Sequence, residues 1–599
     1  MEGGGLASRS KRGKATFLRA GEFGEMQRRI TKMVDPDTAS VFYYTSNNDP
    51  NMRVGPFIDS DIHMPNCGIR TVGGSVYQAG FKNTRIVLGP WNRNFDFRRA
   101  RVGGRVPQVF GIGSMQLHAA DAHEKIRQAT ELGDDRPLII GGGPHAIHQA
   151  WDFFNRNPRD SADVAVRGEA NVTLSLVEVI LNHKGRDETM LSGFERARAE
   201  GALDRIPGLI YISEDRQALI DTGAPLQVGD LDELPLEIVG LSLLEPRHDG
   251  EGLSASPVPL NKLKEQGATV VSLITSAGCN FRCSYCSIPG AYKYSTRARS
   301  PESLVENIRR VIERTGIGFV FGTADNDFAF GGDYLVALYE AMARARVRGG
   351  TFRDRLFFGT EATLHQADLY REHFPLMRAG GLRVLYMGIE DLAARLVSKG
   401  QNAEKAVRTF KAMNASGVSP LIMLMHHDEQ PLQSEAGTLE GLVNQVKFIY
   451  EHGAGSVQIT YNSPSIGSMG YDEHFSQGTV LERAGVLRID SRVLDGNHVV
   501  STKDKDKVGR QNNLTQGYEV FYNWRNLLRA GWRYATSLTG GDRAARDVAE
   551  VALVFQRGGI RGIRISMKNS IEWRDGLASG DYQFARSAPE SAIPIEKVA

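Results

Sequence analysis

Short apolar runs alternate with longer amphipathic stretches over the first third of this chain. The apolar runs that predict strands lie at residues 41–45, 84–88, 108–113, 137–145 and 162–170. Helical patterns follow the last three runs, the clearest of them at residues 172–181. Strands that alternate with helices in this way form parallel sheets covered by helices on both faces. We therefore expect an α/β domain, with ligands bound at the carboxyl ends of its strands.

A second series of apolar runs fills the middle of the chain. The runs lie at residues 270–274, 318–322, 355–360, 383–388, 421–425 and 456–460, and each interval leaves room for a helix. Ser300 and Pro301 mark the start of one such helix, because serine caps helices and proline fits their first turn. The pattern predicts six consecutive β/α units, whose polar strand ends would face a site.

The remaining stretches connect or cover these two units. Residues 1–38 are expected to form an N-terminal arm ending in a short helix, and the first domain to occupy residues 39–235. Prolines interrupt residues 204–262, which predicts a hairpin-like tail and a linker at 236–262. The second domain is assigned to 263–478. Residues 479–599 include an aromatic helix at 517–535 and form either a domain that covers the substrate or a plain structural cap.

Composition excludes several classes of protein. Of the 599 residues, 41% are hydrophobic and 24% charged, and the net charge is only +2, which gives no reason to expect a nucleic-acid partner. No window holds the roughly 18 apolar residues of a membrane helix, and no secretory signal is recognisable. Four cysteines suit a reducing compartment. We expect a cytoplasmic protein, with peripheral membrane contact left open.

Three of the four cysteines lie within eight residues, at Cys279, Cys283 and Cys286. Closely spaced thiolates hold iron–sulfur clusters, and a closed [4Fe–4S] site needs four of them. Three local cysteines would therefore leave one iron open to another ligand. A structural zinc site would need a second pair of Cys or His nearby, and none is present. Simple burial of the thiols is opposed by the polar residues Asn280 and Arg282 between them.

With Tyr285 as its aromatic residue, this Cys-x3-Cys-x-aromatic-Cys segment resembles the signature of the radical S-adenosylmethionine (SAM) enzymes. The resemblance implies a partial (β/α)6 barrel of the TIM type and a [4Fe–4S] cluster whose open iron binds SAM. It also implies reductive cleavage of SAM to a 5′-deoxyadenosyl radical, with the electron supplied by a flavodoxin- or ferredoxin-type donor.

The first domain resembles the cobalamin-binding domain of the B12-dependent radical SAM enzymes. The resemblance rests on an apolar strand that ends Gly-Gly-x-His and on the Arg-Gly-Glu-Ala segment that follows it. It implies a Rossmann-like fold and assigns these residues to the cofactor: Ser114, Gly142, Gly143, Pro144, Gly168 and Glu169. The Asp-x-His-x-x-Gly motif that gives cobalt a histidine elsewhere is missing. The alternative is a Rossmann-like domain that has lost its ligand. The lone Cys67 either reaches a cofactor or is a small buried residue.

Polar residues at the ends of the barrel strands are the other candidates for the site. Glu390, in a segment like the family's Gly-x-Glu-Ser, would bind SAM, unless it is a helix-capping acid. Asp325 and Asp327 would orient SAM or substrate, or else build a turn. His427 would contact substrate or move protons.

A closing turn completes the predicted site. Pro464 and Gly467 resemble the family's Pro-x-x-Gly-Thr turn and would shape the backbone near SAM. Together, the cofactors imply a methyltransferase that acts on an unactivated carbon of a small-molecule or lipid substrate. Residues 357–363 and 425–432 resemble the hopanoid C-3 methylases, which implies a polycyclic lipid. Two alternatives stay open: a ring contraction or cyclisation without methyl transfer, and a corrinoid or redox sensor.

Overall fold

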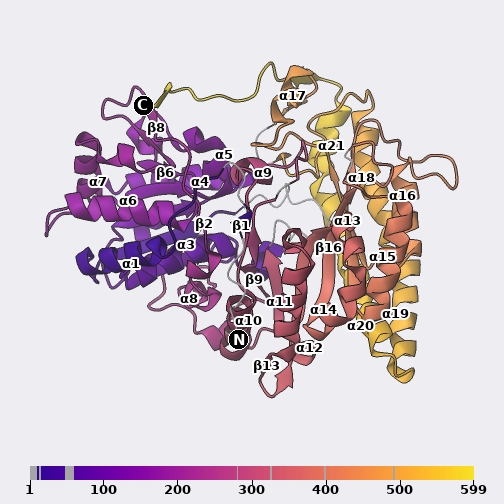
Figure 1. Cartoon of the computed structure of the whole chain (residues 1–599). Helices are drawn as coiled ribbons and strands as arrows, with labels where there is room; N and C mark the ends of the chain where they lie inside the picture. The colour runs from indigo at the N-terminus through magenta and orange to yellow at the C-terminus, as the bar shows by residue number, and fades with distance from the viewer. Residues whose placement is uncertain are drawn as a thin grey trace.

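The computed structural model describes residues 10–11, 15–46, 60–279, 281–323, 327–396, 399–489 and 493–598. The described chain forms two α/β units side by side, with a helical layer on the outer side of the second (Figure 1). The predicted fold class, with its two α/β units and a mainly helical C-terminal region, is confirmed. Within the described residues, no helix combines the length and apolar character needed to cross a bilayer.

The first unit contains an eight-stranded sheet in the order β22-β8-β7-β6-β5-β4-β2-β3. Strands β2 to β6 are parallel, as predicted, whereas β6, β7 and β8 run antiparallel and form the expected hairpin-like tail. The strands are β2 (Ala39–Tyr44), β3 (Asn83–Leu88), β4 (Val109–Gly113), β5 (Leu138–Gly142), β6 (Val164–Val166), β7 (Leu209–Ile212), β8 (Leu219–Asp221) and β22 (Ile595–Lys597).

Both faces of this sheet are buried, because alternate residues of each strand point to opposite sides. Phe42 and Tyr44 of β2 pack with one group of helices, and Val41 and Tyr43 pack with the other. The first group is α1 (Glu22–Met33), α3 (Cys67–Gln78), α6 (Ala170–His183) and α7 (Met190–Ala199), and the second is α4 (Ala119–Thr130) and α5 (Gly143–Gln149). The apolar runs are therefore nearly continuous, as in other doubly covered parallel sheets.

The second unit is a six-stranded parallel sheet in the order β9-β12-β15-β16-β17-β18. Its strands coincide with the six predicted runs: β9 (Val270–Ile274), β12 (Phe319–Thr323), β15 (Phe357–Thr363), β16 (Leu382–Glu390), β17 (Ser419–His426) and β18 (Ser456–Tyr461). The helices between them include α10 (Pro301–Thr315), α11 (Gly332–Arg344), α14 (Phe374–Ala379), α15 (Ala403–Ser416) and α16 (Leu442–Glu451). Ser300 caps α10, since its side chain accepts a hydrogen bond from the Ser303 N–H.

The C-terminal helices close the free edge of the barrel sheet. They are α18 (Lys507–Phe521), α19 (Trp524–Thr539), α20 (Arg543–Asn569) and α21 (Ile571–Ala578). The hydroxyls of Tyr518 in α18 and of Tyr522, the residue after this helix, each donate to a carbonyl of β18 and accept from an N–H of the same strand, at 2.7–2.9 Å. These hydroxyls occupy the place of a seventh strand, so α18 acts at least as a structural cover.

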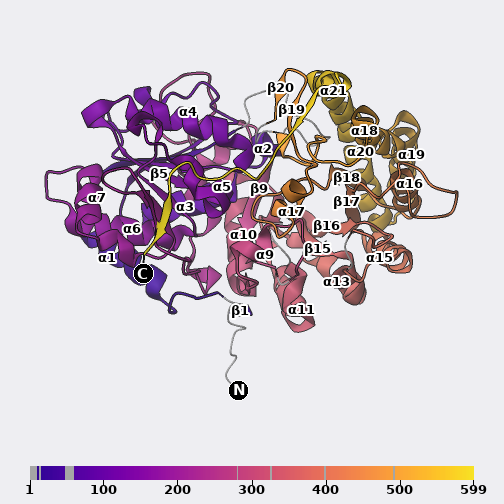
Figure 2. The same ribbon diagram turned by 90° about the horizontal axis from the view of Figure 1, so that it is seen from above.

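After α21 the chain crosses back over the molecule and ends beside the first unit, as the yellow segment in Figure 2 shows. Strand β22 pairs with β8 in parallel, through Ile595 to Lys597. The sequence pattern predicts that these residues belong to the C-terminal domain. Three residues of an exposed edge strand carry too weak a pattern to reveal such a return.

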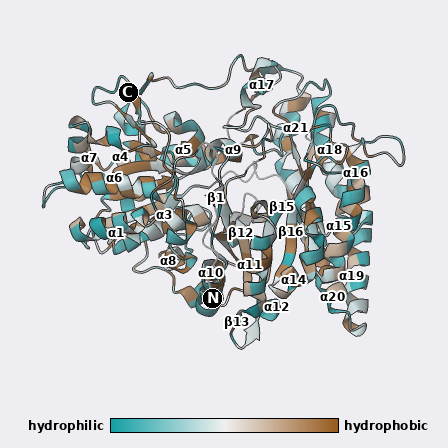
Figure 3. Cartoon of the chain, viewed as in Figure 1, coloured by the Kyte–Doolittle hydropathy of each residue, from teal (hydrophilic) through white to brown (hydrophobic). Residues whose placement is uncertain are grey.

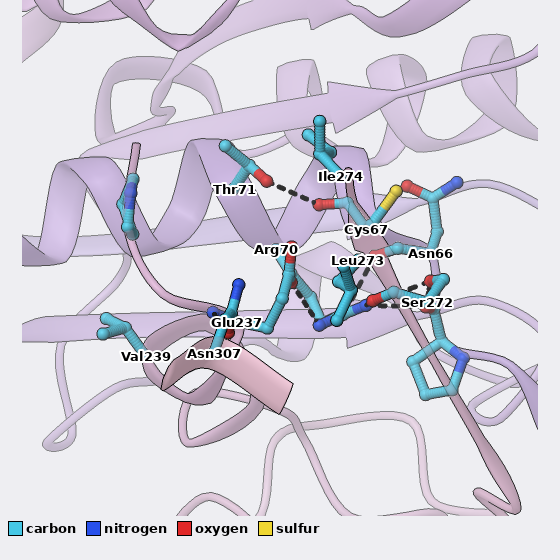
Figure 4. Close-up of polar contacts among 12 residues, drawn as sticks. Asn66, Cys67, Arg70, Thr71, Glu237, Val239, Ser272, Leu273, Ile274 and Asn307 are labelled. Carbon is cyan, nitrogen blue, oxygen red and sulfur yellow. Dashed lines mark hydrogen bonds and ion pairs between the residues drawn. The ribbon is translucent and has the colours of Figure 1, made fainter. Parts of the chain in front are cut away.

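A buried arginine joins the two units at the other side of the barrel (Figure 4). The Arg70 guanidinium of α3 lies 2.5 Å from a Glu237 carboxylate oxygen and donates to the Ser272 carbonyl of β9, also at 2.5 Å. Both partners of the ion pair are almost fully buried. Because a buried charge without a partner is strongly unfavourable, this contact holds α3 against the first barrel strand.

Candidate active site

All three clustered cysteines lie in one loop at the carboxyl end of β9. The loop leaves the short strand β10 (Ser276–Ala277) through Gly278, whose φ is +86°. A Cβ at Gly278 would lie 2.0 Å from the Ser295 carbonyl oxygen, so only glycine fits this turn. Cys283 is buried, and Cys279 and Cys286 are partly buried. The loop ends at α9 (Ile288–Ala291) and β11 (Thr296–Ala298).

The residues of this loop suit an iron–sulfur cluster. The Cys286 N–H donates to the Cys283 carbonyl at 3.2 Å, which turns the backbone between these two cysteines. Within the described part of the chain, no three His, Cys, Asp or Glu side chains already stand at metal-binding range of one another. Three soft thiolate ligands in one loop favour iron–sulfur chemistry.

Glu390 lies beside the cysteine loop, at the end of β16. Its backbone has φ +62°, which is strained for a residue other than glycine, and the strand register shifts between Gly388 and Glu390. Its carboxylate forms an ion pair with Lys399 at 3.0 Å, and only about a tenth of either side chain is exposed. Strain of this kind persists only where surrounding contacts hold it, and it is frequent at functional sites.

Lys399 connects this carboxylate to the cysteine loop. Burial opposes its charge, but Glu390 and Cys283 together raise the pKa of the Lys399 ammonium group above its usual value. The ammonium group also lies 5.4 Å from the centre of the Tyr285 ring. Burial, followed by the nearby Glu390 and Cys283, raises the pKa of Tyr285. Tyr285 therefore stays protonated, and a charged lysine stands between the Glu390 carboxylate and the Cys283 sulfur.

The two histidines at the end of β17 have different environments. His426 is fully buried: its Nδ1 lies 2.8 Å from Gln430 Oε1, and its Nε2 accepts from Arg510 and Asn513 at 3.0 and 3.1 Å. Burial, and after it the Arg510 charge, lower the pKa of His426 to about 3. His426 is therefore a neutral, structural residue, donating from Nδ1 to the Gln430 amide oxygen.

His427 faces a cavity and is oriented by Asp391. Its Nε2 lies 3.6 Å from Asp391 Oδ2. Burial opposes the charge of Asp391, but His427, Gln445 and backbone N–H groups hold the pKa of this carboxyl well below its usual range. Asp391 thus stays ionised beside the His427 ring. This contact supports the predicted proton-transfer role of His427, which stays a prediction.

The cavity beside Tyr285 has a volume of about 350 Å³. It extends from the cysteine loop across the ends of β17 and β18 to the C-terminal region. Its walls are mainly polar and include Tyr285, His427, Asp428, Asn462, His474 and Arg510. Arg510 comes from α18 and lies 3.6 Å from Asp428, so the C-terminal region supplies a buried cation to the cavity. Nothing near Arg510 in the sequence marks it, because only tertiary packing brings it to the barrel.

On the first unit, Ser114, Gly142 and Gly143 lie together at the carboxyl ends of β4 and β5. The Ser114 N–H donates to the Gly142 carbonyl at 3.0 Å, and the Ser114 carbonyl accepts from the His145 N–H at 3.0 Å. Gly143 has φ +83°, and a Cβ there would lie 2.7 Å from the Ser114 oxygen. Pro144 follows in the first turn of α5 and is exposed. The turn is therefore one that glycine alone can make, with its surface open to a ligand.

The closing turn of the barrel touches α5 of the first unit. A Cβ at Gly467, whose φ is +77°, would lie 2.1 Å from the His148 ring and one at Gly290 would lie 3.1 Å from the Gly467 carbonyl. Burial, and after it Lys293, lower the pKa of His148 to about 4, so its ring is neutral. Gly467 thus lies between the helix after the cysteines and the turn predicted for cobalamin. Pro464, also predicted to line the site, lies three residues before it in the same turn.

Glu169 holds the two units together in this structure, and the neighbouring Gly168 packs within the first unit. Both carboxylate oxygens of Glu169 accept from the fully buried Arg297 of β11, at 2.7 and 2.9 Å, and one also accepts from the Val228 N–H. A Cβ at Gly168 would lie 2.6 Å from Val172, so this glycine allows close packing. These contacts account for both residues, and their predicted contact with a cofactor stays a prediction.

Three further candidates differ in what can be said of them. Asp325 lies outside the described residues, as does the side chain of Asp327. Cys67 begins α3, and its thiol donates to the Thr323 hydroxyl at 3.2 Å, since Thr323 itself donates to the Leu273 carbonyl. Burial raises the pKa of Cys67. A protonated thiol that bridges α3 and the end of β12 fits a packing role.

Comparison with known proteins adds to this geometry. Residues 273–434 match the family described as the Radical SAM superfamily. The chain is 24% identical to the cytidylyl-2-hydroxyethylphosphonate methyltransferase of Streptomyces wedmorensis over 64% of its length and 69% of that protein. It is 28% identical to the hopanoid C-2 methylase of Rhodopseudomonas palustris over 29% of its length and 33% of that protein.

A solved structure shares the fold over most of the chain. It is the cobalamin-dependent SAM radical enzyme OxsB with aqua-cobalamin and SAM bound, which matches with a TM-score of 0.54 and 12% identity over 91% of this chain and 83% of that one. The family match covers the cysteine loop and the next four barrel strands, β12, β15, β16 and β17, up to and beyond His427. The resemblance drawn from the cysteine spacing is therefore confirmed.

Proposed function

We propose that this chain is a radical SAM enzyme of the cobalamin-dependent type and that it methylates an unactivated carbon with SAM and cobalamin. The contact between Gly467 and His148 carries the proposal. It places the turn at Gly142 to Pro144 on the same side of the molecule as the cysteine loop. Two cofactors bound at these two strand edges would share one site, as the transfer of a methyl group to a substrate radical requires.

The cysteine loop would bind and activate SAM. Cys279, Cys283 and Cys286 would hold a [4Fe–4S] cluster, which supplies the electron that cleaves SAM and receives it from a flavodoxin- or ferredoxin-type donor. Glu390 would accept hydrogen bonds from SAM, and a charged carboxylate suits hydroxyl or ammonium donors. Lys399 keeps that carboxylate in place and adds positive charge beside the Cys283 thiolate.

Cobalamin would lie against the exposed turn of the first unit. Ser114, Gly142, Gly143 and Pro144 present backbone at the carboxyl ends of β4 and β5, where doubly wound sheets bind their ligands. The glycines allow a large planar group to approach the backbone closely. The relative OxsB, which shares this fold, is described with aqua-cobalamin bound.

The polar cavity is the candidate substrate site. Arg510 and Asp428 would bind polar or charged groups of the substrate, and His427, oriented by Asp391, would move a proton. The similarity to a hopanoid C-2 methylase supports a polycyclic lipid as the finer proposal. The polar walls favour a substrate that has hydrogen-bonding groups at the end that enters this cavity.

The first experiment measures cofactors and methyl transfer together. Protein purified without oxygen is expected to hold about four irons and one corrinoid per chain, and Cys283→Ala is expected to lose iron. With methyl-labelled SAM, label should appear in a product made from polar or hopanoid candidate substrates, assayed by mass spectrometry. Iron without corrinoid, after growth with B12, would contradict the cobalamin proposal. A product without label, with one SAM used per turnover, would indicate ring contraction or cyclisation instead.

A further inference from the structure

Helix α19 lies at the outer edge of the molecule and leaves most of its surface uncovered (Figures 1 and 2). Of its sixteen residues, only Asn526 and Ala530 are buried. Trp524, Leu528 and Trp532 repeat every four residues and are 59%, 72% and 73% exposed. Residues four apart lie on one side of a helix, so these large apolar side chains form a single exposed stripe.

Basic residues flank this stripe on both sides. Arg525, Arg529 and Arg533 follow each apolar residue along α19, and residues 524–541 contain no acid. On the antiparallel neighbour α20, residues 551–571 contain four basic residues and no acid: Arg557, Arg561, Arg564 and Lys568. Within the part of the chain that the structure describes, none of these seven basic side chains, three on α19 and four on α20, forms an ion pair. Figure 3 shows hydrophilic and hydrophobic residues interleaved on both helices.

One contact ties the two helices into a common surface. The Arg564 guanidinium lies 5.6 Å from the centre of the Trp524 ring. We call the exposed stripe of α19 and these basic side chains the α19–α20 face. Amphipathic helices with Trp and Leu on one side and Lys or Arg beside them lie in the interface of anionic bilayers. Nucleic acid would also attract the charge, but it gives no reason for an aliphatic side chain such as Leu528 in the stripe.

We propose that the α19–α20 face binds the surface of an anionic lipid bilayer. The aromatic and leucine side chains would enter the acyl boundary, and the seven cations would pair with anionic headgroups. Charge complementarity favours an anionic bilayer as the partner. The whole chain has a net charge of only +2, yet within the described residues this face gathers seven basic side chains without ion pairs around one apolar stripe. The inference does not depend on the identity of the substrate.

The position of the face fits an enzyme that works while docked. Arg378, just before β16, pairs with Asp547 of α20 at 2.5 Å, and Tyr522 contacts Ser456, the first residue of β18. The helices therefore cover the starts of the barrel strands. Glu390 and His427 lie at the opposite ends of the strands, so a docked molecule would keep the mouth of its site in water.

Co-sedimentation of the holoenzyme with vesicles tests this proposal. Binding is expected to vesicles of phosphatidylcholine with about one third phosphatidylglycerol, and not to phosphatidylcholine alone. Salt at about 0.5 M should reduce the binding, because it screens the charges of the protein and of the lipid headgroups. Arg557→Gln with Arg561→Gln should weaken binding by about thirtyfold, since each basic residue contributes about 1 kcal/mol. Leu528→Ser with Trp532→Ser should weaken it by more than about tenfold.

Matched variants elsewhere separate this face from general effects. Leu369→Ser replaces a leucine of α13 (Leu364–Leu369) that is 61% exposed, and Arg159→Gln with Arg186→Gln removes two exposed arginines of the first unit. Both should bind vesicles like the original protein, and iron content should be unchanged in every variant. Equal binding to both vesicle types, or to neither, would overturn the proposal. The proposal would also be overturned if the protein formed a dimer that Trp532→Ser dissociates, or if single-stranded RNA displaced the vesicles from the protein.

Discussion

At the scale of single residues, the site depends on charges that sequence alone does not pair. Glu390 is recognisable from its segment, yet its partner Lys399 is found only in the fold, nine residues later across a strand end. Likewise, two adjacent histidines look equivalent in sequence. Burial makes His426 neutral and structural, whereas His427 faces the cavity next to an ionised Asp391. Environment, more than residue type, decides the chemistry of each side chain.

Replacing Glu390 tests its role towards SAM. Glu390→Gln removes the charge at constant size, and a lost charge-assisted hydrogen bond of about 1.5–3 kcal/mol predicts SAM binding weaker by roughly tenfold to a hundredfold. Equilibrium dialysis of labelled SAM without oxygen measures this, with iron content expected to stay unchanged. Glu404→Gln, on the exposed surface of α15, is the control. An unaltered affinity for SAM would mean that Glu390 only forms the ion pair with Lys399.

At the scale of elements, turns and strand ends bring the two halves of the site together. The Gly278 and Gly143 turns each exclude any other residue, because the backbone would clash with a Cβ. Sequence patterns predicted both turns as loops after strands. They did not reveal that the closing turn at Gly467 packs on α5, which depends on how the two sheets meet.

A pair of variants tests this contact. Gly467→Ala would push a methyl group into the His148 ring and displace α5, and a displacement near 1 Å predicts turnover lower by up to about a hundredfold. Adding His148→Ala removes the clash and should restore most of the activity. Gly478→Ala is the matched control, since Gly478 also has positive φ, at +64°, but nothing within 4 Å of its Cβ position. Equal activity of Gly467→Ala and Gly478→Ala would contradict the role of this contact.

At the scale of the whole molecule, buried ion pairs set how the two units face each other. Arg297 pairs with Glu169 across the boundary, and Arg70, paired with Glu237 of the linker, crosses it by donating to the Ser272 carbonyl (Figure 4 shows the second contact). The returning strand β22 adds a third link, near the far edge of the first sheet. The orientation of the first unit's strand ends towards the cysteine loop is therefore built into the folded chain.

Replacing Glu169 separates this structural role from a role in cofactor binding. Glu169→Leu removes the carboxylate that pairs with the buried Arg297 and should lower the free energy of unfolding by about 3–5 kcal/mol. Combining it with Arg297→Met should recover most of that loss. Glu178→Ala, which removes a pair with the half-exposed Arg29, should change it by less than about 1 kcal/mol. Urea unfolding followed by tryptophan fluorescence measures all three.

The corrinoid content of the double variant then decides the role of Glu169. If stability returns but corrinoid is lost, Glu169 contacts the cofactor. If both return, Glu169 only joins the two units. A Glu169→Leu variant as stable as Glu178→Ala would contradict the importance of the pair.

The sequence by itself determined the local structure and the cofactor chemistry. Periodicity located all six barrel strands and the parallel strands of the first sheet, because apolar runs reflect burial on both faces. The spacing of Cys279, Cys283 and Cys286 gave the resemblance to the radical SAM enzymes, which the match of residues 273–434 bears out. These features depend on neighbours within a few residues, which a linear sequence contains in full.

Tertiary structure alone decided which distant residues meet. It brought Arg510 to His426, Arg297 to Glu169, His148 to Gly467 and the last strand to the first sheet. It also left α19 exposed, although the aromatic sequence at 517–535 predicted either a domain that covers the substrate or a plain structural cap. Each of these outcomes depends on how two packed surfaces fit. That fit is a property of many side chains at once, so no local pattern records it.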